Sequence, residues 1–189
     1  SPWPCRIRSD EPPPRGRNKR WFDFAEERGI SPDVVHRARE IYAEKVATEL
    51  VTEVGFITND GFGFTIGYSP DALVGQRGLW ECKAPRQKTQ IETIVLGEVP
   101  IDHLLQVQTG LMVSDREWLD FSSYCGGMYM PTFRAYPDEK VQAAILDASR
   151  SFEAKISEKR EAYERAVEGG KMPMTERIVE EEMFIGGEE

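Results

Sequence analysis

The chain has 189 residues, of which 40% are hydrophobic and 30% are charged, a composition typical of a globular domain with short extensions. Its formal net charge of -9 excludes a protein that holds nucleic acid through overall positive charge, so action on DNA would require metal ions or a local basic groove. No apolar run approaches the ~18–20 residues of a membrane helix, and residues 1–20 lack the apolar stretch of a signal peptide. The three cysteines are scattered, which predicts a cytoplasmic protein with reduced thiols.

Charge is concentrated at the two ends of the chain. Residues 1–20 are basic and rich in proline, which predicts an N-terminal arm. The segment 171–189 is strongly acidic and predicts a solvated tail. The hydrophobic periodicity lies between them, so we expect one folded domain over residues 21–170.

The first predicted helix covers residues 31–50. Ser31 is a good N-cap and Pro32 suits the first helical position. Four apolar side chains recur at helical spacing and are expected to face the core: Val35, Ala38, Tyr42 and Val46.

Short strand-like segments follow, and then two further helices. Strands are predicted over 54–59, 62–68, 69–74 and 79–84, with turn residues between them. Further along, an amphipathic helix is predicted over 102–113, strands over 118–124 and 129–136, and a long helix over 137–167. This order predicts an α/β (α+β) fold with a central mixed sheet flanked by helices.

The tripeptide Glu81-Cys82-Lys83 holds the most informative polar pattern. Side chains alternate along a strand, so Glu81 and Lys83 share one face while Cys82 points into apolar packing on the other. Asp71 arrives ten residues earlier across a hairpin-like connection. Two converging carboxylates repel each other unless a divalent cation lies between them, and Mg²⁺ prefers one or two carboxylates with water and phosphate oxygens. A lysine beside them can orient a water or stabilise charge on a phosphate.

An exposed Glu-Lys pair is the ordinary interpretation of a Glu-x-Lys tripeptide. The apolar neighbours of this one favour a central strand instead, and a Pro-Asp pair lies at a suitable distance upstream. The pattern therefore favours metal-dependent phosphodiester hydrolysis.

Residues 69–85, "SPDALVG…LWECKAP", resemble the signature of PD-(D/E)xK nucleases in the form found in phage lambda exonuclease and YqaJ-like viral recombinases. The resemblance continues in "HLLQVQTGLMVSDREWLDFSSYCGGM" (103–128), which is similar to the Q-V-Q helix and following strand of that family, and it extends over residues 34–165. The predicted domain over 21–170 would thus be the nuclease domain.

The resemblance implies a role for each matching residue. Asp71 and Glu81 would bind the metal, as would the backbone carbonyl of Cys82, and Lys83 would position the attacking water. Gln106, the first glutamine of Q-V-Q, would reach the site from its helix, whereas Gln108 is expected to face outward. The implied cofactor is Mg²⁺, with Mn²⁺ able to substitute. An iron–sulfur cluster is not expected, because it requires four cysteines.

The sequence departs from the family pattern in two segments. The family usually places a glutamate on the first helix, but Val35 occupies that position here. His36 lies beside it and a neutral imidazole is a good metal ligand, while Glu40 lies one turn later, so either residue could bind metal. Residues 1–24 also do not match the N-terminal segment that helps to hold the DNA end in the family. Phosphate contacts could come instead from the basic arm, from Arg6, Arg8, Arg15, Arg17, Lys19 or Arg20.

The resemblance implies an exonuclease that resects linear double-stranded DNA and leaves a single strand for an annealing protein. It also implies a ring-shaped homotrimer, and a phage-encoded or prophage-encoded enzyme in the cytoplasm of a bacterial host. Two alternatives stay open: another nuclease of the same fold that acts as an endonuclease or in DNA repair or CRISPR adaptation, and a catalytically silent DNA-binding module.

Overall fold

A computed structural model describes residues 5–8, 33–168, 170 and 172–176. The predicted cap at Ser31 and Pro32, most of the basic arm and the last part of the acidic tail lie outside the described residues. The chain divides into two units, Ser1–Arg150 and Ser151–Glu189. Among the described residues, no helix combines the length and apolar character that crossing a membrane requires.

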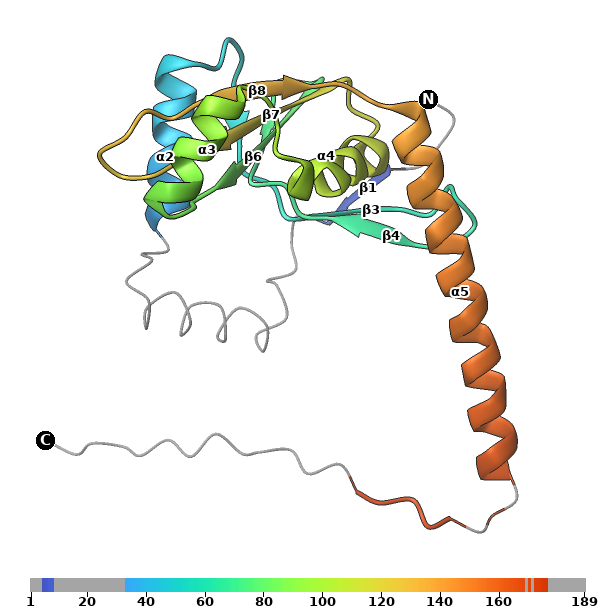
Figure 1. The fold of residues 1–189 in the computed structure, drawn as a ribbon. Coiled ribbons are helices and arrows are strands. Elements are labelled where there is room, and N and C mark those ends of the chain that lie inside the picture. Colours follow the sequence, from blue (N-terminus) through green and yellow to red (C-terminus); the bar gives the residue numbers. More distant parts are fainter. Residues whose placement is uncertain (1–4, 9–32, 169, 171, 177–189) are drawn as a thin grey trace, which may run out of the picture. The chain divides into compact units, whose positions relative to one another are not determined.

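A five-stranded mixed sheet forms the centre of the first unit (Figure 1). Its strands lie in the order β2 (Val51–Thr52), β5 (Ala72–Val74), β6 (Gly78–Lys83), β7 (Trp118–Ser123) and β8 (Thr132–Ala135). Strands β6 and β7 are parallel and every other neighbouring pair is antiparallel. The predicted mixed sheet flanked by helices is confirmed.

A second, antiparallel sheet holds β1 (Cys5–Arg8), β3 (Phe56–Asn59) and β4 (Ile66–Tyr68). Strands β3 and β4 form the hairpin expected from the turn residues "NDG", with Ile57 opposite Tyr68. The helices among the described residues are α2 (Asp33–Lys45), α3 (Gln87–Leu96), α4 (Ile101–Ser114) and α5 (Glu139–Glu168).

Strand β6 is covered on both faces by apolar packing. On one face Leu79 packs with Val107 and Leu111 of α4. On the other face Trp80 and Cys82 pack in a cluster with Ala38 and Tyr42 of α2, where the Tyr42 and Trp80 rings stack with centroids 5.2 Å apart. The two residues that alternate with Trp80 and Cys82, Glu81 and Lys83, therefore share the face covered by α4.

A buried polar group ties α2 to the sheet. The Tyr42 hydroxyl donates to Asp120 Oδ2 at 2.6 Å, and Arg134 donates to both carboxylate oxygens at 2.8 and 2.9 Å. Asp120 is buried, and the Arg134 guanidinium also lies 3.6 Å from the Trp118 ring centroid. This charge is thus paired and hydrogen-bonded, as a buried carboxylate requires.

Two local expectations were wrong. The first helix ends at Lys45 instead of continuing to residue 50, because Val51–Thr52 pair with β5, and Val46 is 41% exposed instead of facing the core. Helix α3 was not predicted at all. Five of its ten residues are β-branched, namely Thr89, Ile91, Thr93, Ile94 and Val95. Its N-cap residue Arg86 makes no side-chain cap, so the usual signals of a helix are weak.

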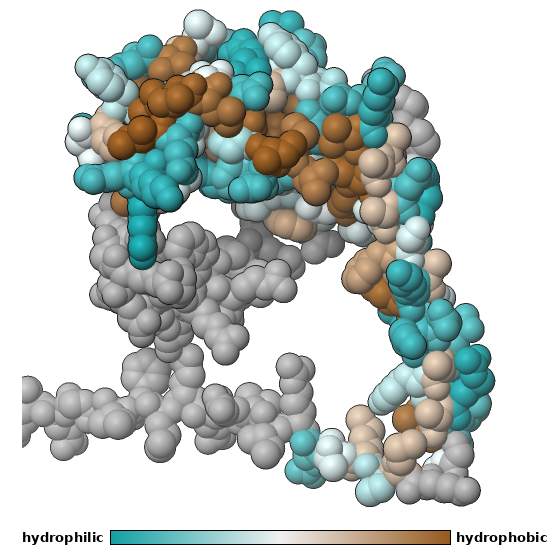
Figure 2. All heavy atoms as spheres, viewed as in Figure 1, coloured by the Kyte–Doolittle hydropathy of each residue, from teal (hydrophilic) through white to brown (hydrophobic). Residues whose placement is uncertain are grey.

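The second unit contains the later part of α5. None of the α5 side chains is buried, and Phe152, Tyr163 and Val167 are exposed among many charged residues. Figure 2 shows this mixture of hydrophilic and hydrophobic surface along the helix.

Candidate active site

The pair Glu81 and Lys83 lies at the carboxyl end of β6. Lys83 Nζ contacts Glu81 Oε1 at 2.6 Å, as expected for residues two apart on one face of a strand. Glu81 is only 3% exposed, whereas Lys83 is partly open to solvent. The site therefore holds a buried carboxylate with a cation on its solvent side.

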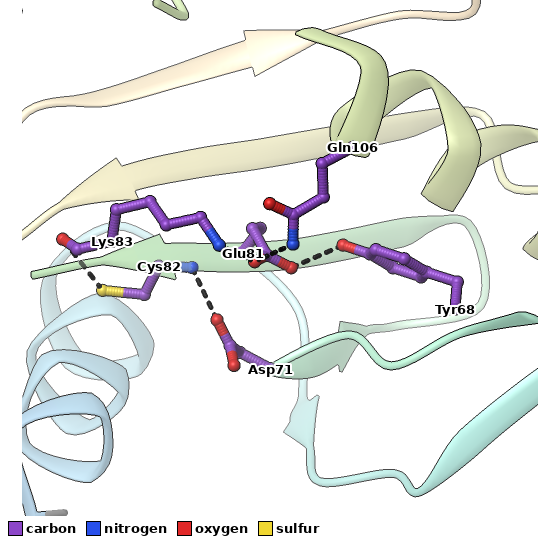
Figure 3. A network of polar contacts seen from close by, with 6 residues as sticks. All are labelled: Tyr68, Asp71, Glu81, Cys82, Lys83 and Gln106. Carbon is purple, nitrogen blue, oxygen red and sulfur yellow. Dashed lines mark hydrogen bonds and ion pairs between the residues drawn. The ribbon is translucent and has the colours of Figure 1, made fainter. Parts of the chain in front are cut away.

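Two further side chains donate hydrogen bonds to Glu81 (Figure 3). The hydroxyl of Tyr68, from β4, donates to Oε2 at 2.5 Å, and Nε2 of Gln106, from α4, donates to Oε1 at 2.7 Å. Gly110, one turn beyond Gln106, allows this approach, because a Cβ there would lie 2.7 Å from the Tyr68 ring. Three donors from three elements thus hold one carboxylate in a single orientation.

Asp71 immediately precedes β5 and approaches the same end of β6. Its Oδ2 accepts a hydrogen bond from the backbone N–H of Cys82 at 2.8 Å, and its backbone carbonyl accepts one from Arg39 Nη1 at 3.1 Å. Arg39 belongs to α2 and also pairs with Glu53. The antiparallel register, with Ala72 opposite Trp80, places Asp71 beside Glu81 across the ladder (Figure 3).

The carboxyl group of Asp71 is harder to ionise here than in water, because it is largely removed from solvent and lies close to Glu81. Burial, and then the charge of Glu81, raise the pKa of Asp71 to about 6, although the Cys82 N–H and the charges of Lys83 and Arg39 act in the opposite direction. Burial also raises the pKa of the Cys82 thiol to about 12, so this sulfur stays protonated and is not a thiolate ligand at neutral pH.

The donor set suits a hard divalent cation. A carboxylate offers about four lone-pair positions, of which Glu81 uses three, and Oδ1 of Asp71 accepts no hydrogen bond from the described residues. Mg²⁺ typically binds one or two carboxylates and completes its shell with water and phosphate oxygens. A cation beside Asp71 and Glu81 would also relieve the repulsion that raises the Asp71 pKa. Asp71 and Glu81 therefore fit the implied Mg²⁺.

The first-helix candidates lie elsewhere. His36 and Glu40 are both exposed and face each other on α2, with Nδ1 3.7 Å from Oε1, and Glu40 also pairs with Arg37. Within the described ranges, no group of three or more His, Cys, Asp or Glu side chains is arranged to hold a metal. The structure thus does not bring His36 or Glu40 to Asp71 and Glu81, and a ligand role for either stays a prediction, as does the role of the Cys82 carbonyl.

The predicted DNA contacts on the basic arm, Arg15, Arg17, Lys19 and Arg20, lie outside the described residues. Arg6 and Arg8 belong to β1, of which only the backbone pairing with β3 is described. Their roles also stay predictions.

Three residues near the site were missed or misplaced from the sequence. Gln108 was expected to face outward but is 2% exposed, donates to the Tyr136 carbonyl and accepts from the Asp138 N–H, so that expectation was wrong. Gln90 of the unpredicted α3 is fully buried and donates to the carbonyls of Ser123 and Tyr129. The sequence did not indicate that Tyr68 contacts the site, because its hydrogen-bond partner Glu81 is 13 residues away.

The fold and part of the sequence are shared with solved structures. The chain is 34% identical to an alkaline exonuclease, LHK-Exo, from Laribacter hongkongensis, with a TM-score of 0.61, and the match covers 70% of this chain and 69% of that one. A structure of LHK-Exo in complex with dAMP matches at 31% identity and a TM-score of 0.63, covering 84% of this chain and 77% of that one. No protein-family model matches the chain, and no curated protein does.

Proposed function

Because this chain belongs to the alkaline exonuclease family, of the lambda exonuclease and YqaJ-like type, we propose that it is a Mg²⁺-dependent exonuclease that hydrolyses phosphodiester bonds of linear double-stranded DNA. The observation that carries this proposal is the convergence of Asp71, Glu81 and Lys83 at one end of β6. A carboxylate pair of which Glu81 is buried and Asp71 half-buried, with an adjacent lysine, has no evident structural purpose, since an apolar residue at either acidic position would avoid the cost of burying charge.

The residues of the site would have two kinds of role: some would bind the metal ion, and Lys83 would act on the water and the phosphate. Asp71 and Glu81 would hold the cation, and Tyr68 and Gln106 hold Glu81 in one orientation through hydrogen bonds to its oxygens. When bound, Mg²⁺ supplies a Lewis acid that favours formation of hydroxide and offsets negative charge on the phosphate. Lys83, on the solvent side of Glu81, is placed to orient the water and to stabilise charge that develops on the phosphate.

The test is digestion of DNA by the purified full chain. Linear duplex DNA should be degraded progressively from its ends with Mg²⁺ or Mn²⁺ and remain intact with EDTA, while covalently closed circular DNA of the same sequence should survive. Lys83→Ala, purified in parallel, controls for contaminating nucleases and should be inactive.

The same experiment separates the alternatives. Cleavage of circular DNA would show an endonuclease of the same fold. Binding of duplex DNA without cleavage of either form would show a silent DNA-binding module. Resection products that carry a single-stranded tail would support a role in supplying an annealing protein.

We further propose that the protein acts as a homotrimer around DNA and functions in phage recombination in the cytoplasm of a bacterial host. The resemblance to lambda exonuclease supports both parts. Light scattering coupled to size-exclusion chromatography tests the assembly, and a monomeric mass at micromolar concentration would contradict it.

A further inference from the structure

Arg39 links helix α2 to the residue that carries one of the two site carboxylates. Its Nη1 donates to the backbone carbonyl of Asp71 at 3.1 Å, and its Nη2 lies 2.5 Å from Oε1 of Glu53. The side chain of Arg39 is only 16% exposed, whereas that of Glu53 is 73% exposed. A charged guanidinium is therefore largely withdrawn from water here, which is costly unless its contacts compensate for the lost hydration.

The backbone of Asp71 lies just beyond the ladder that joins β5 to β6. That ladder ends at Ala72 opposite Trp80, so it does not include Asp71. Instead, the Cys82 N–H donates to the Asp71 carboxylate, and Arg39 donates to the Asp71 carbonyl. Asp71 is thus held at two points, its side chain by β6 and its backbone by α2.

The second partner of Arg39, Glu53, follows the strand on the other side of β5. Strand β2 is antiparallel to β5, with Thr52 opposite Leu73. Continuing this register by one residue places Glu53 opposite Ala72, the first residue of β5. Arg39 therefore bonds to two neighbouring segments at the end of the sheet where the site carboxylates lie. A guanidinium suits this bridge, because its nitrogens donate to two acceptors in a fixed planar geometry.

Helix α2 gives Arg39 a fixed base. Ala38 and Tyr42, one residue before and three residues after Arg39, are fully buried. Both pack in the apolar cluster that contains Ala72 and Trp80, which flank the site on β5 and β6. The guanidinium is therefore anchored to the same strands that carry the carboxylates, and it cannot move without disturbing that packing.

We propose that Arg39 is a positioning residue of the metal site: together with Glu53 it fixes the backbone at Asp71, and thereby the position of the carboxylate that would bind a divalent cation. The inference rests on the proposed function for the identity of the metal, and it deepens that function by giving α2 a part in the site. An aspartate side chain is short, so a shift of its backbone carries the carboxylate with it. Mg²⁺ demands near-ideal octahedral geometry with ligands at ~2.0–2.1 Å, so even a small shift weakens binding.

Calorimetry of Mg²⁺ binding to the full chain without DNA tests the inference apart from any reaction. Arg39→Met keeps an unbranched side chain of similar length but removes both donors, and it should raise the Kd for Mg²⁺ at least about tenfold, as is typical when a partner that orients a metal ligand is lost. Arg39→Lys keeps the charge without the planar fork and should recover only part of the affinity. Arg37→Met is the matched control, since Arg37 is exposed on the same helix and pairs with Glu40, and its Kd should equal that of the wild type. A wild-type Kd in Arg39→Met, or in Arg39→Lys if Arg39→Met does not fold, would overturn the inference.

Amide hydrogen exchange in EDTA distinguishes positioning from a merely structural role. The Cys82 N–H donates to the Asp71 carboxylate, so displacement of Asp71 in Arg39→Met should speed exchange at Cys82 by at least about threefold relative to the amides of β7. A structural role alone predicts faster exchange throughout the sheet together with an unchanged Kd for Mg²⁺, and that pair of results would refute the proposal.

Kinetics with linear duplex DNA separates this inference from the proposed function. Arg39→Met should show a lower kcat/KM at limiting Mg²⁺, and saturating Mg²⁺ should restore most of the kcat, because the ligands themselves remain. A loss of kcat that saturating Mg²⁺ does not reverse would contradict the positioning role. If the wild type bound Mg²⁺ at least about tenfold more tightly than Arg39→Met but cleaved no DNA, the exonuclease would fail and the role of Arg39 would stand. If the wild type cleaved DNA and the two Kd values were equal, the exonuclease would stand and the role of Arg39 would fail.

Discussion

Replacing Asp71 with asparagine should inactivate the enzyme and at the same time stabilise its metal-free form. Burial and the charge of Glu81 raise the pKa of Asp71 from 3.8 to about 6, so the ionised carboxylate is less favourable in the folded protein than in the unfolded chain. At ~1.36 kcal/mol for each pKa unit, the difference at pH 8 amounts to about 3 kcal/mol. An asparagine can still accept the hydrogen bond from the Cys82 N–H but carries no charge.

The dependence on pH follows from the direction of the shift. A carboxyl group whose folded pKa is raised binds more protons in the folded state across the window between the two pKa values, so wild-type stability falls as pH rises from about 4 to about 6. The stability of the variant does not fall in this way, because asparagine does not ionise. The two proteins should therefore differ in free energy of unfolding by about 3 kcal/mol above pH 6 and converge near pH 4.

The assay is urea denaturation of both proteins in EDTA at pH 4, 5, 6 and 8, followed by circular dichroism. The same denaturation is then repeated with Mg²⁺ in place of EDTA. Mg²⁺ at one hundred times its dissociation constant should stabilise the wild type by up to about 2.7 kcal/mol and should stabilise the variant far less. Asp147→Asn, at an exposed position on α5, is the control and should change stability by less than ~0.5 kcal/mol.

A variant that is no more stable than the wild type in EDTA at pH 8 would refute the electrostatic reasoning. So would a stability difference that does not change between pH 4 and pH 8. If the variant still degraded DNA at a rate near that of the wild type, the assigned metal ligand would be wrong.

The remaining predictions concern the other side chains of the site. Lys83→Ala should lower kcat by about 10²–10³-fold and leave the Mg²⁺ affinity measured by calorimetry unchanged, and loss of Mg²⁺ affinity would contradict this role. Lys83→Arg should restore little of the activity, because a planar guanidinium is broader than the compact ammonium group of lysine. Tyr68→Phe and Gln106→Ala each remove one hydrogen bond to a buried carboxylate and should lower stability at pH 8 by about 1.5–3 kcal/mol in urea denaturation, whereas unchanged midpoints would show that these bonds do not form. His36→Ala and Glu40→Ala, at exposed positions, should each raise the activation free energy by less than ~0.5 kcal/mol, and a large loss of kcat/KM in one of them would identify the first-helix ligand.

The sequence by itself determined the features that depend on local geometry. Alternation along a strand was enough to place Glu81 and Lys83 on one face and Cys82 in apolar packing on the other. Helical spacing predicted α4 and α5 to within two residues of their observed ends. The family followed from short motifs around the same strand, because the acidic and basic residues at this strand end form a recognisable local pattern.

Only the tertiary structure decided which side chains meet. Tyr68 and Gln106 both donate to Glu81, yet they come from β4 and α4, and only the order of the strands and the packing of α4 over β6 bring them together. Gln90 and Gln108 look like ordinary surface amides in the sequence, but each is buried and donates to backbone carbonyls that are distant in the sequence, those of Ser123 and Tyr136. The placement of α2 on the face of β6 opposite to Glu81 likewise depends on long-range packing of Tyr42 against Trp80. A periodic pattern specifies which face of an element is buried, but the partner on that face is specified only when non-local contacts form.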